Sequence, residues 1–440
     1  MRLLKQCISV FIIWVTLSVL YAVRIPMGYK SFWAEDGALF YQGAVESSFI
    51  ETLKSPTAGY LLLIGRIGGK ITSYFPIENV TIVNFMIATF VMALCIVTIF
   101  NHSRALISKI PLRAFVTLGL VFIPVSNFDS LANLANLHFT LPFVVLMILV
   151  TSQENSKTSW LSVLLIILAC LSDPLCIFCL PALLNLKRVR TGLSFSINTS
   201  VYSKAYLVSM VIQFGFTAVY LSQGVRSLGQ EHSVAKTTYL FLDRVVGSTF
   251  IPGWGNVSSS DFTEGSFTAK LLFRAAIATV VICIWIILYL KLFANDVVDE
   301  TNMLRNNIIL FQLITSSLAY WFTVGIIFNP EPRYGIFPAL CLLTITAIIV
   351  DRYLSTQGKL KNRKLTLWIF CALISATWIL SWSPSAYRIT GPEWKEEIVK
   401  GVKYCTISKS KTAKLQILPG AGNWYVEVPC STLTKEKNPN

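Results

Sequence analysis

Long apolar runs recur along the whole chain and are separated by short polar segments. Seven of them approach the roughly 20 residues that a helix needs to cross a bilayer: 7–23, 80–100, 205–221, 273–292, 308–328, 336–350 and 365–381. Four shorter runs need extension, tilt or local irregularity to do so: 114–125, 139–150, 160–171 and 175–186. The pattern predicts an all-α polytopic membrane protein with about 11 transmembrane helices.

The composition agrees with this class. Hydrophobic residues make up 54% of the 440 positions and charged residues 13%, whereas ordinary soluble domains carry about 25% charged residues. These proportions exclude a soluble enzyme, a disordered chain and a protein with a single membrane anchor.

Basic residues predict the orientation. Arg2 and Lys5 precede the first run and no small-residue cleavage site follows it, so we expect an uncleaved first helix with a cytoplasmic N-terminus. Alternate loops are rich in basic side chains, whereas the short opposite loops 127–138, 172–174 and 329–335 hold only Arg333. This bias places the C-terminus outside and accounts for most of the net charge of +15 without a nucleic-acid partner.

Three external segments are long: 24–79, 223–272 and the tail 383–440. The chain turns from apolar to mixed polar near Ser383, so we expect a transmembrane domain over 1–382 and a small external domain over 383–440. Within the first loop, 60–75 is expected to form an interfacial helix. Arg66 and Lys70 share one face of it, where they would meet lipid headgroups or a lipid phosphate.

The ten cysteines fall into two groups. Eight lie within or beside the apolar runs, and Cys176 and Cys179 have apolar neighbours that favour core packing over metal or redox work. Cys405 and Cys430 both fall in the tail, where an oxidising compartment favours a disulfide over two unpaired thiols.

Several common catalytic and nucleotide-binding motifs are missing from the sequence. We find no Walker loop, HExxH, GxSxG or dinucleotide fingerprint, so ATP-driven transport has no support. The chemistry must therefore come from isolated polar residues at the outer face.

Glu35 and Asp36, in FWAEDG at 32–37, carry the strongest signal. A general base must be ionised and aimed at the hydroxyl whose proton it takes. Because adjacent residues point apart, we expect one acid to face the site and the other to support it. The structural alternative is that both acids begin a helix over 37–45.

Arg333 and Tyr334 carry the second signal, in the Pro-bounded loop NPEPRYG at 329–335. A single Arg held at the membrane surface can bind a phosphate with two parallel hydrogen bonds. The alternatives are that Arg333 pairs with Glu331 or reaches toward lipid headgroups.

Three further residues carry weaker signals. His138 either binds a phosphate or sugar hydroxyl or is a satisfied structural donor. Arg244 is either a donor-site cation or the partner of Asp243 in an internal ion pair. Asp173, in Ser-Asp-Pro, most simply begins the next helix.

These stretches together resemble the GT-C superfamily of polytopic glycosyltransferases that use polyprenyl-phosphate sugars. In short stretches the amino-acid sequence is similar to that of bacterial O-antigen glucosyltransferases that alter serotype. The matching stretches are FWAEDGALFYQGA at 32–44, NLANLHFTLPF at 133–143, LSDPLCIFCLPALL at 171–184, EPRYGIFPAL at 331–340 and the tail GPEWKEEIVKGVKYC…AGNWYVEVPC. The resemblance covers the whole chain in topology and only short stretches in sequence.

The resemblance implies a GT-C-like helical bundle with juxtamembrane helices from the first external loop, in a bacterial inner membrane with a periplasmic tail. It implies inverting transfer of one sugar, glucose in the similar enzymes. Asp36, or Glu35, would take the proton from the acceptor hydroxyl. Arg333 would hold the donor phosphate and stabilise its leaving charge, with Tyr334, His138 and Arg244 as secondary contacts.

The resemblance also implies partners. The donor is a polyprenyl-phosphate sugar and the acceptor is a lipid-linked envelope glycan such as O-antigen. A donor-synthesising membrane glycosyltransferase and a flippase would supply the donor. Some members of the superfamily use a divalent metal, but Glu35 and Asp36 are the only adjacent acids in the external loops that precede the tail, so we assign no metal ligands and no cofactor.

Two other functions remain open. A transporter or flippase for lipid-linked sugars should carry charged residues inside its spans, and these spans are nearly free of charge. An O-antigen polymerase or ligase should have Arg-rich outer loops, whereas the first loop here is acidic.

Overall fold

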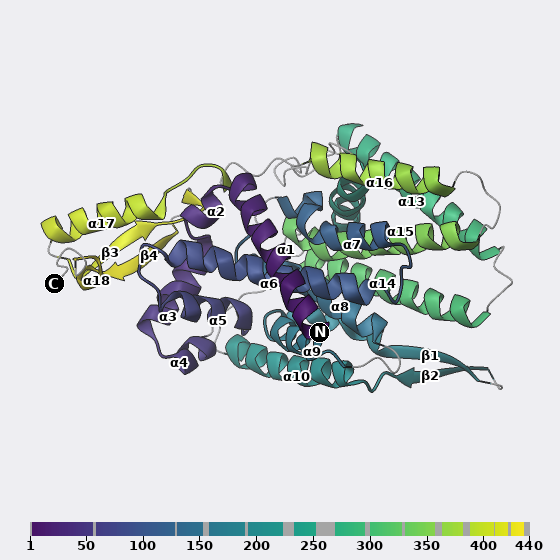
Figure 1. Ribbon diagram of the computed structural model, residues 1–440, viewed down its shortest axis with the longest axis horizontal. Helices are drawn as coiled ribbons and strands as arrows, with labels where there is room; N and C mark the ends of the chain where they lie inside the picture. Colours follow the sequence, from purple (N-terminus) through teal and green to yellow (C-terminus); the bar gives the residue numbers. More distant parts are fainter. Residues whose placement is uncertain are drawn as a thin grey trace.

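The computed structural model describes residues 2–434, except for 56–58, 128–129, 153–157, 190–191, 223–232, 252–268, 295–299, 328–330, 357–362, 382–387, 409 and 421–423. It is an elongated bundle of helices with a small unit of helices and strands at one end (Figure 1).

Five helices in the described part are long and apolar enough to cross a membrane. They are Gln6–Arg24 in α1 (Arg2–Arg24), α6 (Val80–Ser103), α10 (Val201–Ser222), Asn307–Ile327 in α14 (Glu300–Ile327) and Pro332–Ser355, which contains most of α15 (Ile336–Thr356). The other apolar helices are α7 (Ile110–Phe122), α8 (Leu141–Thr151), α9 (Trp160–Cys170), the 3₁₀ helix η5 (Pro174–Leu183), α13 (Ala269–Ala294) and α16 (Arg363–Leu380). The architecture is therefore mostly helical and compatible with a multi-pass membrane protein.

The centre of the bundle is α8. Every residue of this helix is apolar or a terminal Thr, and all of them are buried. A helix that is apolar all round is stable only when other helices surround it, and α8 contacts α6, α9, α14, α15 and η5.

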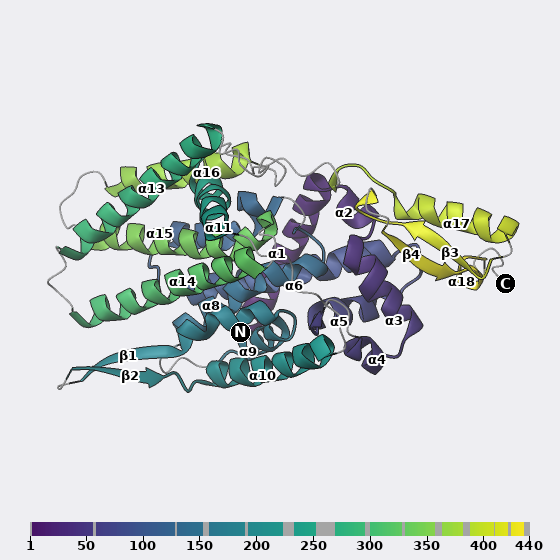
Figure 2. The same ribbon diagram turned by 180° about the vertical axis from the view of Figure 1, so that it is seen from behind.

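The predicted segment 175–186 differs from the structure. Its first part is η5, and from Leu184 the chain leaves the helix and forms the hairpin β1 (Leu184–Val189) and β2 (Gly192–Ile197), with Leu184 opposite Ile197. The strands were not predicted, because an apolar run alone does not distinguish a short helix from a strand. The hairpin projects at the end of the molecule away from the C-terminal unit (Figures 1 and 2).

The first external loop folds into short helices. They are α2 (Met27–Lys30), the π-helix η1 (Asp36–Tyr41), α3 (Gln42–Glu46), α4 (Phe49–Lys54) and α5 (Leu63–Thr72). The predicted helix over 60–75 is thus present as α5, with shorter bounds. Gly69 lets α5 approach η1 closely, since a Cβ there would lie 2.5 Å from the backbone oxygen of Phe40.

The C-terminal unit contains α17 (Trp394–Ser408), β3 (Thr412–Gln416), β4 (Tyr425–Pro429) and α18 (Cys430–Thr434). Strands β3 and β4 are antiparallel, with Thr412 opposite Pro429. A disulfide joins Cys405 to Cys430, as the sequence predicted.

This unit does not stand apart from the rest of the chain. Trp394 is fully buried, its indole lies 5.3 Å from the ring of Phe32, and its Nε1 donates to the backbone oxygen of Ile77. Ile417 and Val426 belong to the same apolar cluster as Phe32. The tail therefore shares a core with the first loop, which the change of composition near Ser383 did not indicate.

Candidate functional site

The candidate site is built around a short 3₁₀ helix, η4 (Ala135–Phe139), which precedes α8. Asp36 caps its N-terminus although the two are far apart in sequence. Its Oδ2 accepts hydrogen bonds from Leu134 N at 2.9 Å and Asn84 Nδ2 at 2.7 Å, and its Oδ1 accepts one from Ala135 N at 2.7 Å. The carboxylate thus ties η1 to η4 and α6.

Burial controls the electrostatics of Asp36. The side chain is fully buried, and removal from water raises the pKa of its carboxyl to about 6, while its three hydrogen bonds act in the opposite direction. Both oxygens are occupied inside the protein. Asp36 is also the first residue of η1, so the structural alternative of a helix beginning at the acidic pair is present, but its carboxylate caps η4 and not its own helix.

Glu35 is placed differently. Its residue is half-buried, and within the described residues its Oε2 has no hydrogen-bond partner. An ionised carboxylate has two acceptor oxygens, so Glu35 retains a site that can accept a proton. This oxygen is itself buried, so of the two acids Glu35 is the one that keeps an enclosed carboxylate oxygen without a hydrogen-bond partner in the described part of the chain.

The backbone beside Glu35 is held by the tail. Ala34 N donates to Leu418 O at 2.6 Å, and Leu418 N donates to Phe32 O at 3.0 Å. The buried guanidinium of Arg388 lies 5.0 Å from the ring centroid of Trp33 and donates to Leu131 O. The tail thus connects the acidic loop to the segment that leads into η4.

His138, in η4, pairs with Asp173. The distance from His138 Nδ1 to Asp173 Oδ2 is 3.3 Å, and the His138 ring lies 6.1 Å from the ring of Tyr60. Asp173 Oδ1 also accepts from Leu175 N at 2.8 Å, so it begins η5 as expected. A carboxylate that accepts a hydrogen bond from Nδ1 favours the tautomer with the proton on Nδ1 and none on Nε2. Within the described residues Nε2 makes no hydrogen bond.

Arg333 and Tyr334 lie at the other end of η4. The guanidinium of Arg333 lies 5.3 Å from the ring centroid of Phe139, and its Nη2 is 2.7 Å from Glu331 Oε2. The Tyr334 ring meets Phe139 edge to face at 4.9 Å. Pairing of Arg333 with Glu331, one of the structural alternatives, is therefore present.

Arg244 lies in the π-helix η6 (Phe241–Gly247), which follows α11 (Val234–Leu240). Its side chain is buried, and burial lowers the pKa of the guanidinium, whereas Asp243 and Glu331 act in the opposite direction. Asp243 forms its ion pair with Arg274 of α13, at 2.6 Å. The electrostatic influence of Glu331 places Arg244 near the Arg333 loop.

Arg66 and Lys70 do not form an exposed cationic face, so that expectation is wrong. Arg66 is buried and donates to the backbone oxygens of Leu61 at 2.5 Å, Thr52 at 2.5 Å and Ser55. Lys70 Nζ donates to Ala44 O at 2.8 Å and to Ser47 O. Both cations satisfy carbonyls near the ends of neighbouring short helices. Arg66 is too enclosed to bind a donor phosphate, and half-buried Lys70 already donates to two backbone oxygens.

Four contributors to the site were missed by the sequence reasoning: Asn84, Arg274, Arg388 and Leu418. Asn84 lies within an apolar run, where a single amide is a weak signal for a buried partner. Leu418 acts through its backbone, so its side chain gives no signal. No three His, Cys, Asp or Glu side chains in the described residues cluster as metal ligands would.

No protein-family model, curated protein or solved structure matches this chain.

Proposed function

We propose that the chain is an inverting membrane glycosyltransferase. It transfers one sugar, glucose by resemblance, from a polyprenyl phosphate to a lipid-linked envelope glycan such as O-antigen. The reaction takes place at the periplasmic face of a bacterial inner membrane. The observation that carries this proposal is the position of Asp36 at one end of η4 and of Arg333 and Tyr334 at the other.

The proposed chemistry follows from those positions. The acceptor hydroxyl attacks the anomeric carbon of the donor sugar as the bond from that carbon to the phosphate oxygen breaks. Glu35 accepts the hydroxyl proton, and the phosphate leaves with the bonding electrons. Asp36 positions Glu35 through its bonds to η4, since its own oxygens are occupied.

Cations receive the leaving charge. Arg333 binds the phosphate oxygens, and the nearby Arg244 adds a positive field in a buried setting where charges interact more strongly than in water. His138, oriented by Asp173, offers its unprotonated Nε2 as an acceptor to a sugar hydroxyl, and it donates to a phosphate oxygen only when the ring is doubly protonated. Tyr334 packs against Phe139 beside them.

Reconstitution tests the proposal. Purified protein in liposomes is supplied with polyprenyl-phosphate glucose and a lipid-linked O-antigen acceptor, and mass spectrometry measures the acceptor. A mass increase of one hexose supports a transferase. Movement of the lipid-linked sugar between leaflets without a change in acceptor mass would instead establish a flippase.

A further inference from the structure

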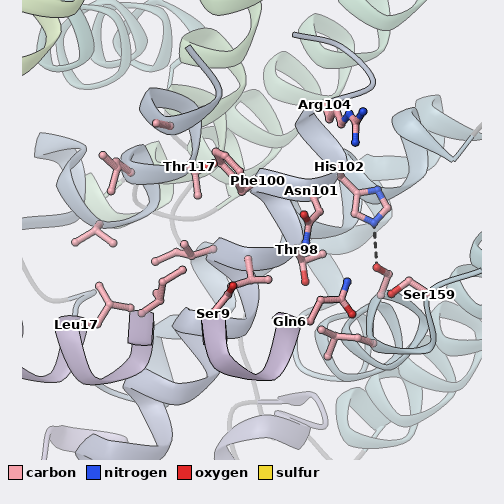
Figure 3. A pocket seen from close by; sticks show the side chains of 18 of the residues that line it. Gln6, Ser9, Leu17, Thr98, Phe100, Asn101, His102, Arg104, Thr117 and Ser159 are labelled. Carbon is pink, nitrogen blue, oxygen red and sulfur yellow. Dashed lines mark hydrogen bonds between the residues drawn. The ribbon is translucent and has the colours of Figure 1, made fainter. Parts of the chain in front are cut away.

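A cavity of about 1070 Å³ lies between α1, α6 and α7, close to the C-terminal end of α6 (Figure 3). Its polar end is distant from the candidate site: along α6, His102, which lines the cavity, lies about 27 Å from Asn84, which binds Asp36, at 1.5 Å per helical residue. The polar end therefore lies outside the proposed transfer site.

The lining changes character along the cavity. Gln6, Asn101, His102, Arg104 and Ser159 gather at one end, whereas Leu17 lies at the other end (Figure 3), and the lining continues along α1 to Leu20. Along α1 the lining extends from Gln6 to Leu20, about 21 Å at 1.5 Å per residue. One leaflet of the hydrocarbon core is about 15 Å thick, so the cavity is long enough for one acyl chain with its polar end attached.

The polar end presents a cation to the cavity. Arg104 is exposed, and the residues that line the cavity include no Asp or Glu. His102 does not compete for a ligand, because its Nδ1 contacts Thr151 Oγ1 at 2.7 Å and its Nε2 contacts Ser162 Oγ at 2.9 Å. An anionic lipid headgroup beside Arg104 complements the positive charge of this lining.

The apolar end is accessible from the bilayer. The α1 face outside the cavity exposes Ile8, Phe11, Ile12 and Val15, as expected for a helix that meets lipid on that side. Leu118 of α7 lines the cavity and is itself exposed. A lipid can therefore enter sideways between α1 and α7.

We propose that this cavity binds an anionic phospholipid of the bilayer, with its phosphate at Arg104 and one acyl chain along α1 toward Leu20. The occupant is a lipid of the leaflet opposite the proposed transfer site. The inference depends on α1 and α6 as membrane helices and is independent of the proposed transferase activity.

Nanodiscs with equal amounts of phosphatidylglycerol and phosphatidylethanolamine, each carrying a photoreactive acyl chain in separate samples, test it. After irradiation, peptide mass spectrometry measures crosslinks to α1 and α7. We expect about fivefold more crosslinking by the anionic lipid, the effect of one cation near a membrane surface. Arg104→Gln should remove this preference, and Lys109→Gln, an exposed cation at the same end outside the cavity, should retain it.

A second pair of variants tests the path of the chain. Ile13→Trp fills the cavity and should abolish the crosslinks, whereas Ile12→Trp, on the exposed face of the same helix, should leave them unchanged. Equal crosslinking by both lipids, or by both tryptophan variants, would overturn the proposal. Displacement of the phospholipid by equimolar polyprenyl phosphate would overturn it as well.

Discussion

Asp36 and Arg333 lie at opposite ends of one short helix, η4. Asp36 accepts hydrogen bonds from the N–H groups of Leu134 and Ala135, and Arg333 lies over the ring of Phe139. At about 2 Å per residue in a 3₁₀ helix, these ends are about 10 Å apart. A single short element therefore separates the Asp36 side of the proposed site from the Arg333 side.

Glu35→Gln should lower the rate of sugar transfer by about 10²–10⁴-fold, the usual contribution of a general base. The amide is nearly the same size but cannot accept the acceptor proton. The measurement is the initial rate with polyprenyl-phosphate glucose, alongside thermal unfolding, which should not change. Glu46→Gln, an exposed acid in the same loop, is the matched control and should keep full activity. A fully active Glu35→Gln protein would exclude Glu35 as the base.

Asp36→Asn should change how stability depends on pH. Burial holds the pKa of Asp36 at about 6, above its ordinary value of 3.8, so the folded protein keeps this proton over a range in which the unfolded chain loses it. The free energy of unfolding therefore falls as pH rises from about 4 to about 6, by about 3 kcal/mol from this group. The Asn variant lacks this contribution.

Denaturant unfolding of wild type and Asp36→Asn at several pH values measures that contribution. The difference between their unfolding free energies should shift against wild type between about pH 4 and 6 and stay constant at higher pH. A difference that does not vary over this range would show that Asp36 ionises as an ordinary carboxyl.

Arg333→Ala should raise the KM for the polyprenyl-phosphate donor by about 10- to 100-fold, the loss expected for hydrogen bonds to a charged group. The KM for the acceptor should change little, because Arg333 lies at the phosphate end of η4. Glu331→Gln is the informative control, since it removes the ion-pair partner and keeps the guanidinium. An unchanged donor titration in Arg333→Ala would remove Arg333 from the phosphate site.

The sequence identified the class of fold and the acidic pair, but not the contacts of that pair. Apolar runs predict helices because the burial of a helix follows the spacing of the apolar residues in its own sequence. The partners of Asp36 are backbone groups of Leu134 and Ala135, which only the folded bundle brings near it. No pattern in the local sequence encodes that meeting.

The same limit explains the wrong expectation for Arg66. Helical spacing correctly put Arg66 and Lys70 on one face of α5. Which face turns inward depends on the short helices around it, whose terminal carbonyls at Thr52 and Ser55 needed donors. The same limit applies to the tail. Trp394 of the tail packs against Phe32 of the first loop in one apolar core, although most of the chain separates the two residues in sequence.

Replacing Cys405 and Cys430 by serine should destabilise the C-terminal unit by about 3.5 kcal/mol, the loop-closure value for a separation of 25 residues. Because Leu418 holds the backbone at Phe32 and Ala34, sugar transfer should also weaken, and protease should cut the tail sooner. Non-reducing mass spectrometry of the wild type should find the two cysteines linked. Cys283→Ser, an exposed cysteine outside the tail, is the control and should change neither property. Two free thiols in the native protein would refute the disulfide.

Gly69→Ala should disrupt the contact between α5 and η1. The added methyl would lie 2.5 Å from the backbone oxygen of Phe40, and backbone cannot move aside as a flexible side chain can. We expect a lower melting temperature and less transfer, since η1 carries Asp36. Gly43→Ala is the matched control: a Cβ there meets nothing within 4 Å, so this helical substitution should be neutral or stabilise the protein by up to about 1 kcal/mol. Thermal unfolding of both variants in the same detergent decides the matter, and equal melting temperatures would contradict close packing of α5 on η1.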